Sequence, residues 1–168
     1  MPITPIDHQR VARLSDAAQG RERLRANDNL HPELADPVQR MLNALEPGTY
    51  VRPHRHDDPP KWELFLALSG AAACLTFDEA GTVTERCEIR AGGPLYGVEI
   101  PAGAWHSVAA LEPATVLFEI KPGPYAPLAD KDFASWAPAE GEAGAAAFEE
   151  WLRHAPAGAA PPRIAAGE

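Results

Sequence analysis

Two histidines separated by a single residue, His54 and His56, are the first feature of this sequence that could carry chemistry. Successive side chains on a β-strand point to opposite faces, so both imidazoles would leave the same face of a strand. A neutral imidazole offers one ring nitrogen to a transition metal, and two imidazoles on one face can bind a single ion. The pair therefore indicates part of a metal site.

An acidic residue and a third histidine lie further along the chain. Glu63 leads the apolar run 64–68, where it would share a face with Phe65 and Ala67. A carboxylate on a core-facing strand is unfavourable unless it is paired, protonated or bound to a metal. His106 follows a turn rich in proline and glycine and begins another strand. Three imidazoles and one carboxylate around a divalent ion leave one or two positions for water or substrate.

These residues lie in two motifs that resemble the signatures of cupins. Residues 48–70, GTYVRPHRHDDPPKWELFLALSG, are similar to the first cupin motif: glycine, five residues, His-x-His, a short loop, glutamate, six residues and glycine. Residues 101–106, PAGAWH, resemble the second motif, in which histidine follows Pro-x-Gly after two residues. The resemblance implies a small β-barrel that binds one metal ion through four side chains: His54, His56, Glu63 and His106.

Longer phrases are similar to the WbuC family of cupin-fold metalloproteins, a family named for its association with O-antigen polysaccharide gene clusters. They include RLRANDNLH, DPVQRMLNALEPGTYVRPHRH and KPGPYAPLADKDFASWAPAEG, and the resemblance covers roughly residues 21–152. One departure is the spacer DDPPKW between His56 and Glu63, which is longer than the usual cupin spacer and predicts an enlarged loop at 57–60. A rigid Pro-Pro pair in that loop argues against Asp57 or Asp58 as a metal ligand.

Short strands should surround these motifs. Alternating apolar residues bounded by turn residues predict seven strands. The expected strands are 49–52, 63–68, 72–77, 83–90, 95–100, 105–111 and 115–121. Strands without long intervening helices favour an antiparallel sandwich or a small barrel. The expected fold class is therefore mainly β: a single cupin, as a small antiparallel barrel or jelly roll, with an N-terminal helical segment and a short C-terminal helix.

Helical periodicity appears on both sides of the strands. Apolar residues three and four apart predict a helix within 7–25, and a third helix is expected near 143–152. A second helix is expected over 37–45, with Asp36 as N-cap and an apolar stripe ending at Leu45. We expect residues 1–46 to form a helical arm on the barrel of residues 47–122. Residues 123–153 would be an extension packed on that barrel, and 154–168 a disordered tail.

Five side chains near the motifs are candidates for contact with a bound small molecule. They are Tyr50, Arg52, Lys61, Trp105 and His31. On the last strand we take Val116, Phe118 and Ile120 as the inner set, which makes Glu119 and Lys121 a surface pair. The arginines between residues 10 and 25 form either a solvated helix face or a group of which one or two reach an anionic ligand. His8 and His154 lie near the chain ends and should face solvent.

Charge and cysteine content limit the partners and the compartment. The 168-residue chain contains 24 Asp+Glu and 15 Lys+Arg, a formal net charge of −9. Nucleic acids and anionic membranes bind cationic patches, so we expect neither as a partner. No apolar leader is visible, and we expect a cytoplasmic protein. Cys74 and Cys87 would face each other across a hairpin, and in a reducing compartment we expect two buried thiols rather than a disulfide.

Three functions are compatible with such a site. The first is a metal-dependent enzyme acting on a sugar or carboxylate of surface polysaccharide metabolism. The second is an Fe(II)-dependent dioxygenase of a small organic substrate, and the third a non-catalytic ligand-binding module. Nitrogen and oxygen ligands without a thiolate suit one divalent Fe, Mn, Ni, Co, Cu or Zn ion. The resemblance to cupins also implies a homodimer.

Overall fold

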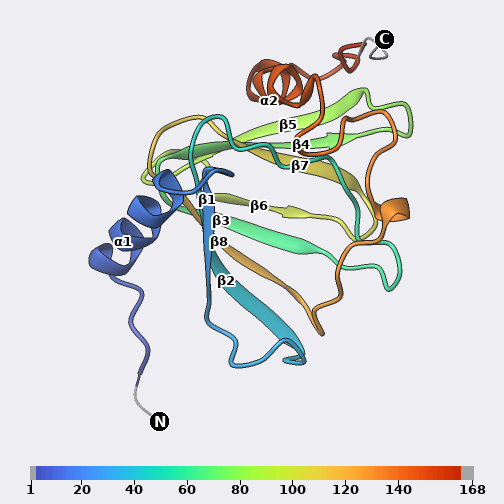
Figure 1. The fold of residues 1–168 in the computed structure, drawn as a ribbon. Coiled ribbons are helices and arrows are strands. Elements are labelled where there is room, and N and C mark those ends of the chain that lie inside the picture. Colours follow the sequence, from blue (N-terminus) through green and yellow to red (C-terminus); the bar gives the residue numbers. More distant parts are fainter. Residues whose placement is uncertain (1–2, 164–168) are drawn as a thin grey trace.

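The computed structural model describes residues 3–163 and arranges their strands in two antiparallel sheets that face each other (Figure 1). The larger sheet has the strand order β1-β2-β8-β3-β6, and the smaller has the order β5-β4-β7. Hydrogen-bonded strand pairing does not join the two sheets into a closed barrel within these residues. The strands are β1 (Arg25–Asn29), β2 (Val38–Leu45), β3 (Glu63–Ser69), β4 (Ala71–Phe77), β5 (Val83–Arg90), β6 (Gly97–Ile100), β7 (Trp105–Ala110) and β8 (Thr115–Pro122).

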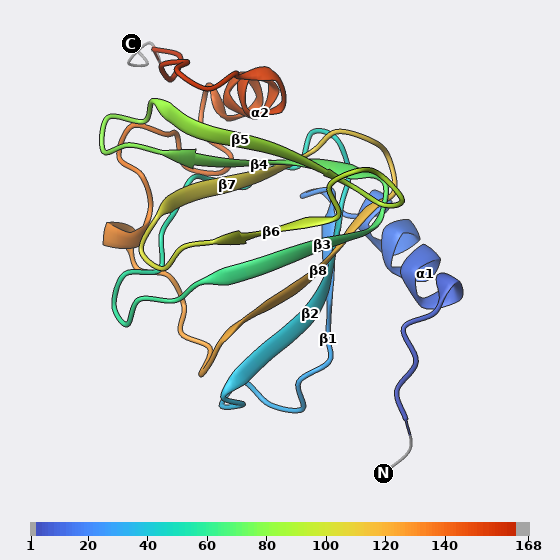
Figure 2. The same cartoon turned by 180° about the vertical axis from the view of Figure 1, so that it is seen from behind.

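Helices cover the outer faces of both sheets (Figure 2). Helix α1 (His8–Gln19) packs on β1, β2 and β8, and its N-cap Asp7 accepts a hydrogen bond from the backbone of Arg10 at 2.8 Å. Helix α2 (Ala145–His154) packs on β4 and β7, and a short 3-10 turn (Asp130–Asp132) precedes it. The fold class predicted from the sequence, mainly β with an N-terminal helix and a short C-terminal helix, is confirmed.

Three apolar clusters hold these layers together. The central cluster lies between the sheets and includes Phe65 of β3, Ile89 of β5 and Leu117 of β8. A second cluster joins α2 to the smaller sheet, and a third joins α1 to the larger one. Strands β4 and β7 are therefore buried on both faces, which explains why their sequences are almost continuously apolar.

The helix expected over 37–45 is wrong, because this segment is strand β2. It pairs along its whole length with β8, from Val38 opposite Pro122 to Leu45 opposite Thr115, and β1 pairs with its other edge. Leu42 packs toward α1, whereas Leu45 faces the space between the sheets. A strand covered on both faces carries apolar residues at odd-numbered and at even-numbered positions. Such a strand can show apolar residues at helical spacing although it is not a helix. Long-range pairing therefore overrides the local capping signal.

Two further differences lie close to the site. Strand β1 was not expected, and residues 49–52 form an irregular segment instead of a strand. On β8 the expected inner set was wrong as well. Leu117 belongs to the central cluster, whereas Val116 packs toward α1. Glu119 therefore points between the sheets, with an exposed fraction of 6%.

The hairpin of β4 and β5 has the predicted register. Cys74 is paired with Cys87, and both are free thiols. Cys74 is buried as expected, and burial raises the pKa of its thiol to about 12. Cys87 is only partly buried, so the expectation of two buried thiols holds for Cys74 alone.

Phe148→Ala should destabilise the protein strongly, because α2 depends on this side chain for its contact with the smaller sheet. Phe148 has an exposed fraction of 0%, and its ring lies 5.0 Å from that of Trp151. Loss of a fully buried phenylalanine typically lowers the free energy of unfolding by about 3–5 kcal/mol. Urea unfolding followed by circular dichroism measures the change. Leu34→Ala, at a side chain 55% exposed, is the control, and equal effects of the two changes would contradict this packing.

Candidate metal centre

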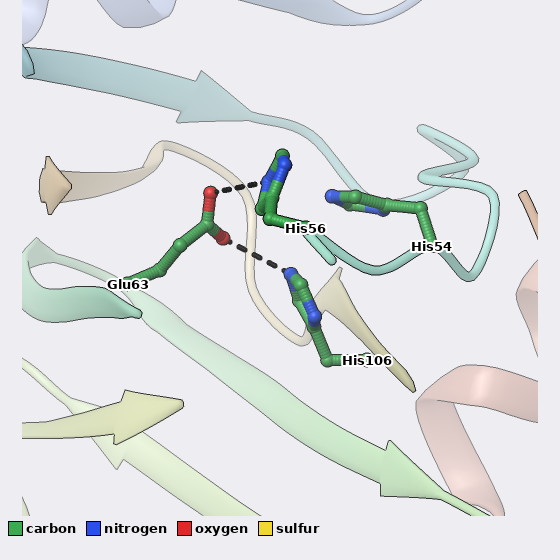
Figure 3. A group of neighbouring side chains, drawn as sticks. All are labelled: His54, His56, Glu63 and His106. Carbon is green, nitrogen blue, oxygen red and sulfur yellow. Dashed lines mark hydrogen bonds and ion pairs between the residues drawn. The ribbon is translucent and has the colours of Figure 1, made fainter. Parts of the chain in front are cut away.

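Four side chains from separate parts of the chain point toward one another (Figure 3). His54 and His56 come from the irregular segment before β3, Glu63 begins β3, and His106 lies in β7. Each offers one ligand atom, and these atoms all lie within 4.8 Å of one another. The structure thus brings together all four metal ligands expected from the sequence.

Backbone pairing positions His54 against His106. The amide of His54 donates to the carbonyl of His106 at 3.0 Å, and the amide of His106 donates to the carbonyl of His54 at 2.9 Å. The two ring centroids are 4.4 Å apart. This bridge anchors the irregular segment to the smaller sheet, so the two imidazoles are held by main-chain hydrogen bonds.

The tautomers of these two histidines follow from their neighbours. The Nδ1 atom of His54 lies 3.0 Å from the carbonyl oxygen of Arg52, and that of His106 lies 2.9 Å from the carbonyl oxygen of Ala104. A carbonyl only accepts hydrogen bonds, so Nδ1 carries the proton in both rings. When each ring is neutral, its Nε2 lone pair is available to a metal, which is the arrangement that carbonyl partners of metal-binding histidines commonly impose.

Glu63 is the acidic centre of the cluster and is 2% exposed. Its Oε1 lies 2.8 Å from Nε2 of His56 and 2.8 Å from Nζ of Lys121, and its Oε2 lies 3.0 Å from Nε2 of His106. Burial by itself would raise the pKa of this carboxyl group, but hydrogen bonds from His106 and His56 and the charge of Lys121 hold it well below its usual range. These contacts favour the ionised form of Glu63.

The cluster suits a bound cation. Nε2 of His56 is buried and has no well-aligned hydrogen bond despite its 2.8 Å approach to Glu63. Three imidazoles and one carboxylate form a donor set that first-row transition metals prefer. The side chains of His54, His56, Glu63 and His106 would hold the ion, and when bound it would supply a Lewis acid for a ligand oxygen.

A cavity of about 510 Å³ opens beside the cluster and is bordered by three of the four ligands. Its walls combine apolar side chains such as Phe65 and Leu117 with charged ones.

Glu119 and Lys121, which were expected to be a surface pair, line this cavity instead, and we call the surface that they form with Asn43 the polar floor of the cavity. Glu119 Oε1 is 2.7 Å from Lys121 Nζ, and its Oε2 accepts a hydrogen bond from Asn43. Burial raises the pKa of Glu119, and the nearby charge of Glu63 adds to the effect.

Sequence reasoning assigned these two residues to the wrong face because only one face of β8 was treated as buried. Glu119 and Lys121 follow Leu117 at steps of two residues, so all three side chains lie on the same face of β8. If Leu117 faces the interior, Glu119 and Lys121 must do so as well.

Three of the predicted ligand-contact residues border cavities or lie buried between strands. Arg52 borders a cavity of about 420 Å³ that also touches His54. Lys61 borders one of about 370 Å³ together with His54, His56 and Lys121, and its Nζ donates to the carbonyl of Pro124 at 2.5 Å. His31 is 5% exposed between β1 and β2, where its Nδ1 accepts from the amide of Arg40 at 3.1 Å. Contact of these residues with a ligand stays a prediction.

The two aromatic candidates lie in the apolar cluster under α2. The hydroxyl of Tyr50 donates to the carbonyl of Pro138 at 2.9 Å, and the indole of Trp105 donates to Glu79 at 3.0 Å. Both polar atoms are thus engaged within the protein. In the enlarged loop, Asp57 and Asp58 are exposed and do not belong to the four-residue cluster, as the Pro-Pro pair suggested.

Three solved structures are similar to this protein. TT1209 from Thermus thermophilus is 22% identical and aligns over 73% of this chain and 97% of its own, with a TM-score of 0.51. A cupin superfamily protein (DSY2733) from Desulfitobacterium hafniense DCB-2 is 20% identical over 65% of this chain and 86% of its own, with a TM-score of 0.48. KdgF from Halomonas sp. is 16% identical over 64% of this chain and 82% of its own, with a TM-score of 0.46. A comparison with curated proteins found no match.

The two facing sheets and the His/Glu cluster between them define a cupin-fold protein with a candidate metal centre. The family model described as "Domain of unknown function (DUF6016)" matches residues 6–89, half of the sequence, and the chain belongs to this family. The matched segment runs from α1 to β5 and contains His54, His56 and Glu63. Neither helix α1 nor α2 has the length and apolar character of a membrane span.

His106→Ala should remove most of the metal affinity. The change deletes one of four converging donors and leaves Glu63 without its 3.0 Å partner. Elemental analysis after dialysis against Co²⁺ should find about one ion per wild-type chain, and calorimetry should find at least about a hundredfold weaker binding in the variant. His154→Ala, at an exposed histidine in the last turn of α2, is the matched control. Equal metal content in the two variants would contradict the assignment.

Metal affinity should rise with pH, because a proton must leave His106. Burial alone would lower the pKa of this ring, but Glu63 raises it above the ordinary value of 6.5. Burial lowers the pKa of His54 to about 3, so that ring is already neutral near neutral pH. Below the raised pKa of His106, Co²⁺ affinity should increase by roughly tenfold per pH unit from this ring, and above it this dependence should end. Calorimetry in buffers of different ionisation enthalpy measures the proton release. Binding without proton release below that pKa would contradict this.

Proposed function

We propose that this protein is a mononuclear metal-dependent enzyme acting on a small sugar or carboxylate substrate. The observation that carries the proposal is the charged floor of the 510 Å³ cavity next to the metal ligands. An inner sheet face that only stabilised the fold would be apolar. Here Asn43 donates to Glu119, Glu119 pairs with Lys121, and Lys121 donates to Glu63.

The polar floor is suited to hydroxyl and carboxylate groups. Lys121 contributes an ammonium group, Asn43 an amide, and Glu119 a carboxyl group whose pKa is raised, chiefly by burial. Burial strengthens hydrogen bonds made to such groups, because little water competes for them. A substrate oxygen directed at the metal centre would thus be oriented by these three side chains. Glu119 can exchange a proton with it at a carboxyl oxygen.

Finer features of the proposal rest on the resemblance of the sequence to the WbuC family. We place the substrate in surface polysaccharide (O-antigen) metabolism, where sugars and sugar acids are the common intermediates. We also propose a homodimer in a reducing cytoplasm. In such a compartment Cys74 and Cys87, which are neighbours across the hairpin, would remain thiols.

Glu119→Gln should leave metal binding intact and lower turnover by about a hundredfold or more, because it removes the proton-carrying group and keeps the shape of the side chain. Wild type and variant are loaded with Fe²⁺, Mn²⁺, Co²⁺, Ni²⁺ or Zn²⁺ under argon and tested on a panel of sugar acids and nucleotide sugars. Metal content is measured in the same samples. Glu112→Gln changes a partly exposed carboxylate paired with Arg90 and is the matched control.

Other outcomes of this assay favour the alternatives. Oxygen consumption that requires Fe²⁺ and accompanies substrate loss would favour a dioxygenase. Metal-loaded wild type that binds panel members without converting them would favour a ligand-binding module. Unchanged turnover in Glu119→Gln would overturn the role given to the polar floor.

A further inference from the structure

Three arginines and one carboxylate border a single cavity next to His54, which we call the rim. Arg25 begins β1 and Arg23 lies two residues before it, Arg52 lies two residues before His54, and Glu140 comes from the segment that precedes α2. All four residues border the 420 Å³ cavity. The separation of Arg23 and Glu140 by 117 positions shows that only the fold brings this group together.

Glu140 is held as a bound oxyanion would be held. Its Oε1 accepts from Nε of Arg23 at 2.6 Å, and its Oε2 lies 2.5 Å and 2.9 Å from the guanidinium groups of Arg23 and Arg25. This two-pronged contact is the geometry in which arginine recognises carboxylate and phosphate groups. The Glu140 side chain remains 39% exposed, so solvent and solutes can reach it.

The rim carries more positive than negative charge. Arg52 makes no ion pair within residues 3–163; its guanidinium donates to the carbonyl of Ala134 at 3.0 Å and lies 5.2 Å from the ring centre of Phe133. Its buried Nε has no hydrogen-bond partner in the same part of the chain. Three guanidinium groups and one carboxylate therefore line this cavity, an excess of two positive charges in a chain whose formal net charge is −9.

The rim, which is the cavity of Arg23, Arg25, Arg52 and Glu140, adjoins the cavity of the candidate metal centre. His54, Arg23 and Arg25 border both the 420 Å³ cavity and the 510 Å³ cavity that reaches Glu63 and Lys121. A single small molecule can therefore contact the arginines at one end and approach the metal ligands at the other. Pockets of these volumes are in the range that small ligands occupy.

We propose that Arg23, Arg25 and Arg52 form an oxyanion subsite, in which Glu140 stands in for the ligand and gives way when it binds. The subsite selects ligands that carry a phosphate or carboxylate group distal to the atom presented to the metal, such as a sugar phosphate or a sugar acid. This inference rests on the proposed function for the second end of the ligand. The arginine end rests on the contacts of Glu140 with Arg23 and Arg25 and on the position of Arg52 in the wall of the same cavity.

Opposite effects of two substitutions test the subsite. Glu140→Gln removes the competing carboxylate and should tighten the binding of inorganic phosphate by about threefold or more. Arg52→Gln removes the guanidinium that has no ion pair among residues 3–163 and should weaken it by about tenfold. Calorimetric titration is carried out on chelator-treated protein as well as on Zn²⁺-loaded protein, with circular dichroism to check the fold. Variants are compared within one metal state, so a failure of the metal centre does not alter the comparison.

The pair Arg90 and Glu112 provides matched controls away from the site. Glu112→Gln and Arg90→Gln change the net charge by the same amounts and should leave phosphate affinity unchanged. If Glu140→Gln lowers or does not alter phosphate affinity, or if Arg52→Gln binds as wild type does, the subsite is overturned. A structural role for the Glu140 contacts would lower thermal stability in Glu140→Gln without tightening phosphate binding, which counts against the proposal.

Glucose 1-phosphate distinguishes the source of the oxyanion. If the subsite serves a larger ligand, this compound should bind more tightly than inorganic phosphate to the metal-loaded protein, and the advantage should shrink after chelation. Phosphate and glucose 1-phosphate of equal affinity in both metal states would overturn the link to the metal centre. The two charge variants would still decide the arginine subsite.

Discussion

The buried carboxylate of Glu63 is the constraint on which the site depends. An ionised group with 2% exposure needs compensating partners, and this one has three within 3.0 Å: His56, His106 and Lys121. These partners come from an irregular segment and from both sheets. The electrostatic requirement of one side chain therefore ties together parts of the chain that are far apart in sequence. A cation at the same place would compensate the charge of Glu63 and would lie within reach of Nε2 of His56.

Each of the two sheets supplies different parts of this site. The smaller sheet supplies His106 and, through its backbone, holds His54 in place. The larger sheet supplies Glu63 and a polar inner surface on β2 and β8. Apolar packing between the sheets and on both outer faces surrounds the polar cluster and its cavity.

The charged groups near the candidate metal centre differ from those around Glu140 in burial and in pairing. Close to Glu63 the charged groups are buried and mutually paired, as in the contact of Glu119 with Lys121. At the rim, arginines outnumber carboxylates, and Glu140 remains within reach of solvent. A ligand that enters from the side of Glu140 would first meet ion pairs within reach of solvent. It would meet the buried pair of Glu119 and Lys121 last. This order is suited to capture at the rim and orientation at the centre.

The resemblance to the cupin motifs implied the four candidate metal ligands, whereas local sequence patterns determined the six strands from residue 63 onward and the pairing of Cys74 with Cys87. Each depends on short spacings or on strand alternation, which neighbouring residues alone decide. Tertiary structure decided that residues 38–45 are a strand, that Glu119 and Lys121 face inward, and that Glu140 meets Arg23. Because helices cover the outer faces of both sheets, a strand can carry apolar residues on both of its faces. Its sequence then does not tell which face points between the sheets. Contacts across more than a hundred residues leave no local pattern, because they form only when the sheets and the C-terminal segment pack together.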